Sequence, residues 1–310
     1  MDTEDKKTAW RKLLDEDQEW RKYNWMDAPD MYSHVAQLMG NVNWIEHARD
    51  THLIPLQKKL YQLDNKHDKR LKLLSVGCGS GTIERECLIQ DWPVASLHCL
   101  EYDTELLKAA ENNLAEFDCQ KTFSFFDMND CLSVSFGTFD AVFFCHSMHH
   151  CTNFEDLMNF IQRSLHPEGI VFGADYFGPA RFQVGYETLI LLKDIFRCLP
   201  ERLRLDLGTM EIDVEYSPPL LQSVIGHDPT EAPRSADIRG LFFSNFPVID
   251  YRPMGGTLLR FLLSNRSGNY RNADDRHILN LLQFIERTLI RYGSIQSDDL
   301  FFVCKRSLRL

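Results

Sequence analysis

Short apolar runs alternate with amphipathic segments in the middle of the chain. Runs at 73–76, 97–100, 122–126, 139–144 and 169–175 have the length and composition of buried parallel strands. Segments with helical periodicity separate several of them, at about 82–91, 104–116 and 154–164. Strands that alternate with helices form βαβ units. The pattern therefore predicts an α/β fold with a mostly parallel sheet and helices on both faces.

The pattern changes on either side of this middle region. The N-terminal residues read as helical, and a further helix is predicted at 186–198. Periodicity weakens between Pro200 and Pro247, and a long stretch of this kind in a compact protein is typically functional or mobile. Later patterns predict two strands and a helix, at 248–251, 300–304 and 278–292. We therefore predict an N-terminal helical cap (1–68), a ligand-binding core (69–176), a substrate-covering insertion (177–246) and a C-terminal completion of the core (247–310).

A glycine-rich turn follows the first apolar run. Gly77, Gly79 and Gly81 form a G-x-G-x-G pattern. Glycine lets the backbone turn sharply and approach a ligand closely, and the helix that follows offers free N–H groups. Glu101 ends the second strand, where an acid can accept both hydrogens of a ribose diol. The turn predicts a nucleotide-type ligand, and its spacing disfavours a nicotinamide oxidoreductase, whose fingerprint is G-x-G-x-x-G.

Five ordered motifs resemble those of class I S-adenosylmethionine-dependent methyltransferases, and they lie at 75–81, 126–128, 139–144, 147–150 and 165–169. The resemblance covers about residues 70–176. It implies a Rossmann-like seven-stranded sheet with strand order 3-2-1-4-5-7-6, and S-adenosylmethionine as cofactor. It also implies that Asp127 contacts the adenine and that 165–169 is the turn before strand five. The predicted cofactor-binding residues are Gly77, Cys78, Gly79, Gly81, Glu101, Tyr102, Asp127, Met128 and Cys145.

Ser75 departs from the pattern of this family, which has Asp or Glu two residues before the first glycine. That acid helps to hold the loop around the methionine end of the cofactor. A serine hydroxyl donates and accepts hydrogen bonds but supplies no countercharge. The departure keeps open a second interpretation, in which the chain is a cofactor-binding but catalytically degenerate module.

Polar residues after strands four and five are candidates for the acceptor side of the site. Methyl transfer depends mainly on alignment, and a general base helps when the acceptor carries a proton. His149 and His150 are the candidate bases because histidine titrates near neutral pH, with structural packing as the alternative. Arg181 is a candidate clamp for a substrate carboxylate, with a surface ion pair as the alternative. The predicted substrate-binding residues are Tyr32, His146, Tyr176, Arg181 and Gln183.

Composition narrows the function further. The net charge of −11 disfavours a nucleic-acid acceptor. We find no apolar run of about 18 residues or more, as a membrane span requires, and no signal-peptide pattern at the N-terminus. The nine scattered cysteines suit a reducing cytoplasm. Residues 145–151 combine cysteines and histidines, but ligands packed this closely give poor tetrahedral geometry, so no metal is expected.

These observations predict a cytoplasmic methyltransferase that acts on an O or N atom of a small-molecule metabolite. A protein acceptor is the alternative within the same class. The sequence leaves the acceptor and the oligomeric state open.

Overall fold

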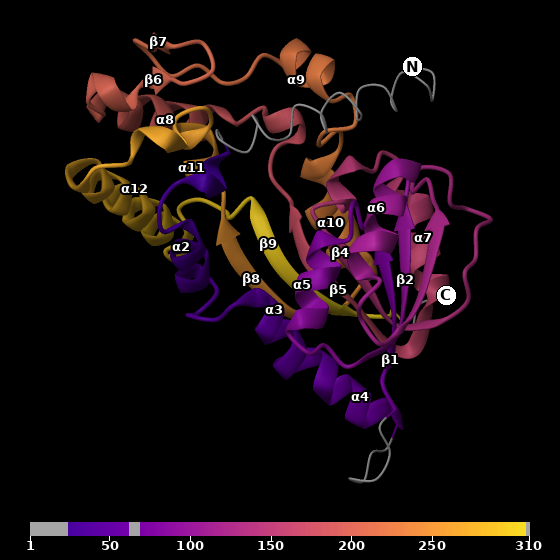
Figure 1. Cartoon of the computed structure of the whole chain (residues 1–310). Coiled ribbons are helices and arrows are strands. Elements are labelled where there is room, and N and C mark those ends of the chain that lie inside the picture. The colour runs from indigo at the N-terminus through magenta and orange to yellow at the C-terminus, as the bar shows by residue number, and fades with distance from the viewer. Residues whose placement is uncertain (1–23, 62–68, 308–310) are drawn as a thin grey trace. The chain divides into compact units, whose positions relative to one another are not determined.

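The computed structural model describes residues 24–61 and 69–307 (Figure 1). The chain forms two compact units, each built from three separate stretches. The first unit contains the described residues up to Asn41, together with Phe177–Ala236 and Pro253–Leu300. The second contains Val42–Tyr176, Asp237–Arg252 and the described residues from Phe301 onward. Each unit draws on more than one of the four predicted segments, whose boundaries stay a prediction.

A seven-stranded sheet has the order β3-β2-β1-β4-β5-β9-β8. Its strands are β1 (Leu71–Val76), β2 (Val94–Glu101), β3 (Gln120–Phe125), β4 (Phe139–Cys145), β5 (Leu165–Tyr176), β8 (Val248–Gly255) and β9 (Asp299–Lys305). Within the run β3-β2-β1-β4-β5, each pair of neighbouring strands is parallel. The chain runs outward from β1 to β3 and returns beside β1 as β4. This reversal is a topological switch point, where open α/β sheets bind ligands. The predicted fold and strand order are confirmed.

Three helices complete the βαβ units at the predicted places: α5 (Thr82–Ile89), α6 (Thr104–Leu114) and α7 (Phe154–Ser164). Helix α6 packs against β2 and β3, and α7 packs against β4 and β5. The Asp103 side chain caps α6 by accepting from two backbone N–H groups, and the Asn153 side chain caps α7 by accepting from one. These caps fix the first residue of each helix. Helix α6 begins just after β2 ends, and α7 begins after the loop that follows β4.

The described part of the N-terminal region is helical, as predicted. Its helices are η2 (Trp25–Asp27), α2 (Met31–Leu38), α3 (Trp44–His47), the π-helix η3 (Ala48–Leu53) and α4 (Ile54–Tyr61). Residues 1–23 and 62–68 of the predicted cap lie outside the described residues. No helix in the described ranges combines the length and the apolar character of a membrane span.

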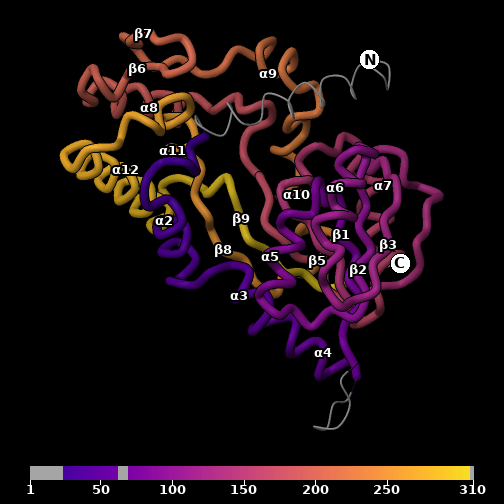
Figure 2. The backbone as a smooth tube through the Cα atoms, in the orientation of Figure 1, coloured from indigo at the N-terminus to yellow at the C-terminus, as the bar shows by residue number. Residues whose placement is uncertain are grey.

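The weakly patterned stretch after β5 forms short elements. They are η5 (Ala180–Phe182), α8 (Tyr186–Cys198), η6 (Glu201–Leu203), the hairpin of β6 (Leu205–Asp206) and β7 (Glu211–Ile212), α9 (Leu221–His227) and α10 (Ser235–Asn245). After β8 come α11 (Leu259–Leu263), η7 (Ser267–Asn269) and the long helix α12 (Ala273–Arg291), whose path Figure 2 traces. The first unit has its own apolar core, which includes Met31, Phe196 and Leu262. Helix α8 has the predicted bounds, whereas α9, α10 and the hairpin were not predicted.

One local expectation was wrong. Strand β5 begins at Leu165, so residues 165–169, expected to form a turn, belong to the strand. The register shifts between the pair Phe139–Leu165 and the pair Ala141–Ile170. This irregularity accommodates Pro167, which has no N–H to donate to a regular ladder.

Candidate functional site

The glycine loop after β1 combines tight packing with one open position. All three glycines have positive φ, which is +72° at Gly77, +53° at Gly79 and +73° at Gly81. A Cβ on Gly77 would lie 2.5 Å from the Cβ of Ser147, and one on Gly81 would lie 3.1 Å from Ala110. A Cβ on Gly79 would meet nothing within 4 Å. Close packing therefore explains why positions 77 and 81 are glycine, whereas Gly79 faces a space that a ligand can fill.

Glu101, at the end of β2, holds this loop. Its Oε2 accepts from the Gly79 N–H at 2.7 Å, and its Oε1 accepts from Tyr102 and Asp103 at 2.7 and 3.0 Å. Burial raises the pKa of Glu101 in spite of these three bonds. An ionised carboxylate has about four acceptor sites, so about one remains for a ligand hydroxyl.

Glu84 provides a buried carboxylate beside Ser75. The Ser75 hydroxyl donates to Glu84 Oε1 at 2.5 Å, and both side chains are buried. Glu84 Oε2 is also buried and has no hydrogen-bond partner among the described residues. Burial is the main cause that raises the pKa of Glu84 to about 7. A carboxyl group thus reaches the position beside Ser75 from helix α5 instead of from β1.

The remaining predicted cofactor residues lie around the same strand ends. The Met128 Cε would lie 3.6 Å from a Cβ built on Gly77. Asp127 Oδ1 accepts from the Asn129 N–H at 2.8 Å, and the Tyr102 ring lies 5.5 Å from that of Phe125. Two predicted cysteines have thiols with raised pKa values: the buried Cys78 through its Cys99 neighbour and burial, and the partly exposed Cys145 through desolvation.

His149 and Asp175 form a buried pair after β4 and at the end of β5. His149 Nδ1 lies 2.6 Å from Asp175 Oδ1. Asp175 also accepts from the backbone N–H groups of Ser147, Met148, His149 and Tyr176, at 2.8 to 3.3 Å. Burial raises the pKa of Asp175, but the His149 ring and these hydrogen bonds outweigh it, so the net pKa lies below its usual value. Because a carboxylate only accepts, His149 donates from Nδ1, which leaves Nε2 as its basic nitrogen.

Three other predicted residues surround this pair within the same unit. The His150 ring lies 4.3 Å from that of His149, and His146 lies 6.5 Å from it. The buried Tyr176 ring meets the His149 ring edge-on at 6.0 Å. The Ser147 hydroxyl donates to the Val76 carbonyl at 2.6 Å and thereby ties the loop after β4 to the end of β1.

The other three predicted substrate residues belong to the first unit. Tyr32 is 82% exposed. Arg181 donates to the carbonyls of Asp228 and Glu231, at 3.4 and 2.8 Å. Gln183 donates to the carbonyls of Arg181 and Pro219. Arg181 therefore ties its own loop together through backbone groups, and its predicted role as a carboxylate clamp stays a prediction.

Two polar residues of this site were missing from the sequence-based set. Asp175 is an acid at the carboxyl end of a parallel strand, as is Glu101, and that position was a usable signal. Glu84 gave a weaker signal, because an acid in the first turn of a helix normally serves the helix dipole in solvent. Only the fold shows that Glu84 is turned inward onto Ser75.

Comparisons with known proteins agree with this geometry. A family model described as a methyltransferase domain matches residues 74–173. No curated protein matches the chain. An S-adenosylmethionine-dependent methyltransferase from Mesorhizobium loti is 12% identical over 80% of this chain and 95% of its own, with a TM-score of 0.44. Phosphoethanolamine N-methyltransferase 2 from Haemonchus contortus, solved with S-adenosyl-L-methionine, is 14% identical over 83% of this chain and 52% of its own, with a TM-score of 0.45.

The family model covers the strands that meet at the switch point, and the open space above Gly79 fits a cofactor laid across the loop. The chain therefore contains a methyltransferase domain, over residues 74–173, on the Rossmann-like sheet expected of S-adenosylmethionine-dependent methyltransferases.

Proposed function

We propose that this methyltransferase acts on an O or N atom of a small molecule whose acceptor atom carries a proton. The observation that supports this most directly is the contact of 2.6 Å between His149 Nδ1 and Asp175 Oδ1. The pair orients the imidazole and stabilises it when protonated, which suits removal of a proton from a phenol, an alcohol or an ammonium group. The two residues stand at the strand ends where the acceptor is expected.

The roles that we assign to the cofactor residues follow from their contacts. S-adenosylmethionine, when bound, supplies a methyl group already activated on a sulfonium. Glu101 keeps the glycine loop in place through Gly79 and accepts from the ribose with its remaining site. Glu84 supplies the negative charge that Ser75 lacks, and its unpartnered Oε2 accepts from the cationic methionine end. This reading removes the main reason to regard the chain as a degenerate module.

The acceptor class and the setting are supported by composition. A net charge of −11 disfavours an anionic polymer as acceptor. None of the nine cysteines, all of which lie in the described residues, forms a disulfide, which suits our proposed cytoplasmic setting. We assign residues 177–246 to a cover for the acceptor, with Arg181 and Gln183 as its candidate contacts.

The acceptor class is tested with cofactor carrying a labelled methyl group. The enzyme is incubated with the small-molecule fraction and, separately, with the protein fraction of a cell extract. We expect label in the small-molecule fraction, and His149→Gln should abolish it. Label confined to protein bands would replace this proposal with a protein acceptor.

Cofactor binding is tested by titration calorimetry on three variants. Glu101→Ala should weaken binding by roughly 1.5–3 kcal/mol, or about 10- to 150-fold, because hydrogen bonds to a charged group are lost. Gly79→Val should abolish binding because the side chain fills the cradle. Gly137→Val is the matched control, since Gly137 also has positive φ (+98°) and open space around its Cβ. Normal affinity in Gly79→Val would show that the loop does not hold the cofactor.

The role of Glu84 is tested with Glu84→Gln, which keeps an acceptor for the Ser75 hydroxyl but removes the charge. Because the pKa of Glu84 is raised to about 7, this carboxyl ionises between pH 6 and 8. Wild-type affinity for S-adenosylmethionine should therefore rise over that interval, and the variant should lose about tenfold at pH 8, as expected for one charged contact. Equal affinity of the two proteins at pH 8 would make Glu84 purely structural.

A further inference from the structure

A second cluster of histidines and a carboxylate lies in the second unit, apart from the site described above. His47 ends helix α3, His52 lies in the π-helix η3, and Asp250 lies on the edge strand β8. Residues five apart on an α-helix point about 140° away from each other. The π-helix, with its i to i+5 repeat, brings such residues onto one face. This rare element therefore lets His47 and His52 point in the same direction.

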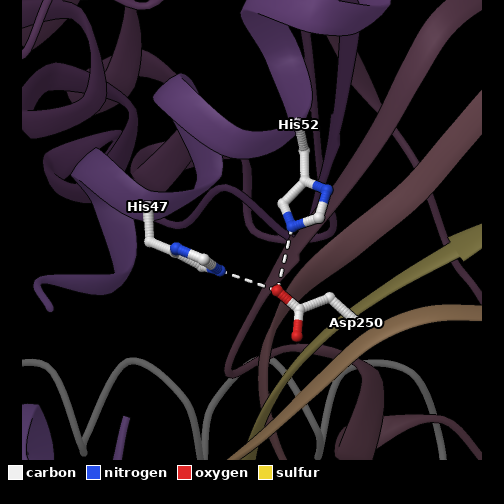
Figure 3. Close-up of side chains that lie close together, drawn as sticks. All are labelled: His47, His52 and Asp250. Atoms are coloured by element: carbon white, nitrogen blue, oxygen red, sulfur yellow. Dashed lines mark hydrogen bonds and ion pairs between the residues drawn. The ribbon is translucent and has the colours of Figure 1, made fainter. Parts of the chain in front are cut away.

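The two imidazoles converge on one oxygen atom, as Figure 3 shows. His47 Nε2 lies 2.6 Å and His52 Nε2 lies 3.0 Å from the same Asp250 Oδ2. The three ligand-type atoms lie within 4.8 Å of one another. Both histidine side chains are 8% exposed and that of Asp250 is 16% exposed, so the cluster is enclosed but open to small solutes.

Neighbouring groups orient the three side chains as an outer shell does in metal sites. The Thr51 hydroxyl bonds His47 Nδ1 at 3.2 Å, which fixes the ring with Nε2 toward Asp250. Asp250 Oδ1 accepts from the Tyr251 N–H at 2.9 Å and from Arg252 Nε at 3.2 Å. The same Arg252 Nε also lies 3.3 Å from Oδ2, and together these bonds hold the carboxylate with Oδ2 toward the two imidazoles.

We propose that His47, His52 and Asp250 form a binding site for a divalent transition-metal ion, with zinc as the best match. Two imidazoles and one carboxylate are a common zinc ligand set, and the fourth position would take water. Ligand bonds of about 2.0–2.1 Å in a tetrahedron need ligand atoms about 3.3 Å apart. The contacts of Asp250 Oδ2 with His47 and His52, at 2.6 and 3.0 Å, would have to open by about 0.7 and 0.3 Å. The ion would tie the α3–η3 segment to the edge strand β8 as a structural staple.

The site is tested on the full chain without a histidine tag, first freed of metal with a chelator. One equivalent of zinc should raise the melting temperature of the wild type. Cobalt(II) should give the visible absorption bands of a tetrahedral site, which zinc then removes. These readouts do not involve methyl transfer, so they are independent of the proposed reaction.

Three variants assign the response to this cluster. His52→Gln and Asp250→Asn should lose the zinc shift and the cobalt spectrum, because each removes one ligand. His277→Ala, at an exposed position on α12, is the matched control and should keep both. A wild type with no zinc shift and no cobalt bands would overturn the proposal. An unchanged response in His52→Gln would also overturn it, because the ion would then be bound by the cysteines or by other histidines.

Discussion

Two aspartates in this enzyme each hold a histidine ring, but they differ in what else they bind. Asp175 accepts from four backbone N–H groups besides the His149 ring. Asp250 accepts from one backbone N–H and otherwise faces side chains: His47, His52 and Arg252. Asp175 is fully buried, whereas 16% of the Asp250 side chain is exposed.

The difference indicates two uses of the same pair of residue types. Backbone bonds from consecutive residues leave Asp175 no freedom to turn, so it fixes one imidazole at one angle, as a proton-transfer step requires. Side-chain partners can move by a few tenths of an ångström, so Asp250 and its two imidazoles can adjust around a guest ion. The rigid aspartate therefore belongs to the proposed catalytic pair, and the adjustable one belongs to the proposed metal site.

The largest effect that tests this contrast is expected from Asp175→Asn. An asparagine side chain cannot accept at both atoms, so it opposes either the backbone N–H groups or the His149 ring. We expect kcat to fall by roughly 10²–10⁴ and the melting temperature to fall as well. Steady-state kinetics on a small-molecule acceptor, with the cofactor Kd measured alongside, checks this.

A double variant separates catalysis from folding damage. If Asp175 acts through His149, the double variant with His149→Gln and Asp175→Asn should have a kcat little lower than that of the more impaired single variant. In the wild type, turnover should fall as the pH drops and the His149 imidazole becomes protonated. His150→Gln should retain most of the activity. Near wild-type kcat in His149→Gln would mean that alignment alone drives the reaction, and the contrast between the two aspartates would fail.

Much of the fold was predictable because its signals are local. The apolar runs of β1 and β4 and the glycines at 77, 79 and 81 lie close together in the sequence, and each has one ready structural explanation. The first unit was harder, because its core joins Met31, Phe196 and Leu262 from distant parts of the chain. Its short hairpin and helix α9 depend on that packing and carry little periodicity of their own.

The polar residues of the two sites also differ in how far the sequence predicted them. His149 and Glu101 were predictable, since they follow strands whose carboxyl ends meet at the switch point. Asp175, the partner of His149, could be predicted only by knowing which strand lies beside β4. His47, His52 and Asp250 gave no signal, because 198 residues separate His52 from Asp250 and a π-helix is not visible in a hydrophobic pattern.

The smallest expected effect concerns Asp250 in acid, with the protein freed of metal. Because its folded pKa is about 2, below the unfolded value near 3.9, its charge stabilises the fold above pH 4. That contribution is lost as pH falls through about 2. The unfolding free energy of wild type should therefore exceed that of Asp250→Asn at pH 6, and the gap should narrow toward pH 2.5. Asp50→Asn is the control, since Asp50 pairs with Arg49 on the surface, where such a pair contributes little. A gap that stays constant from pH 6 to 2.5 would assign the stabilisation to hydrogen-bond geometry instead of charge.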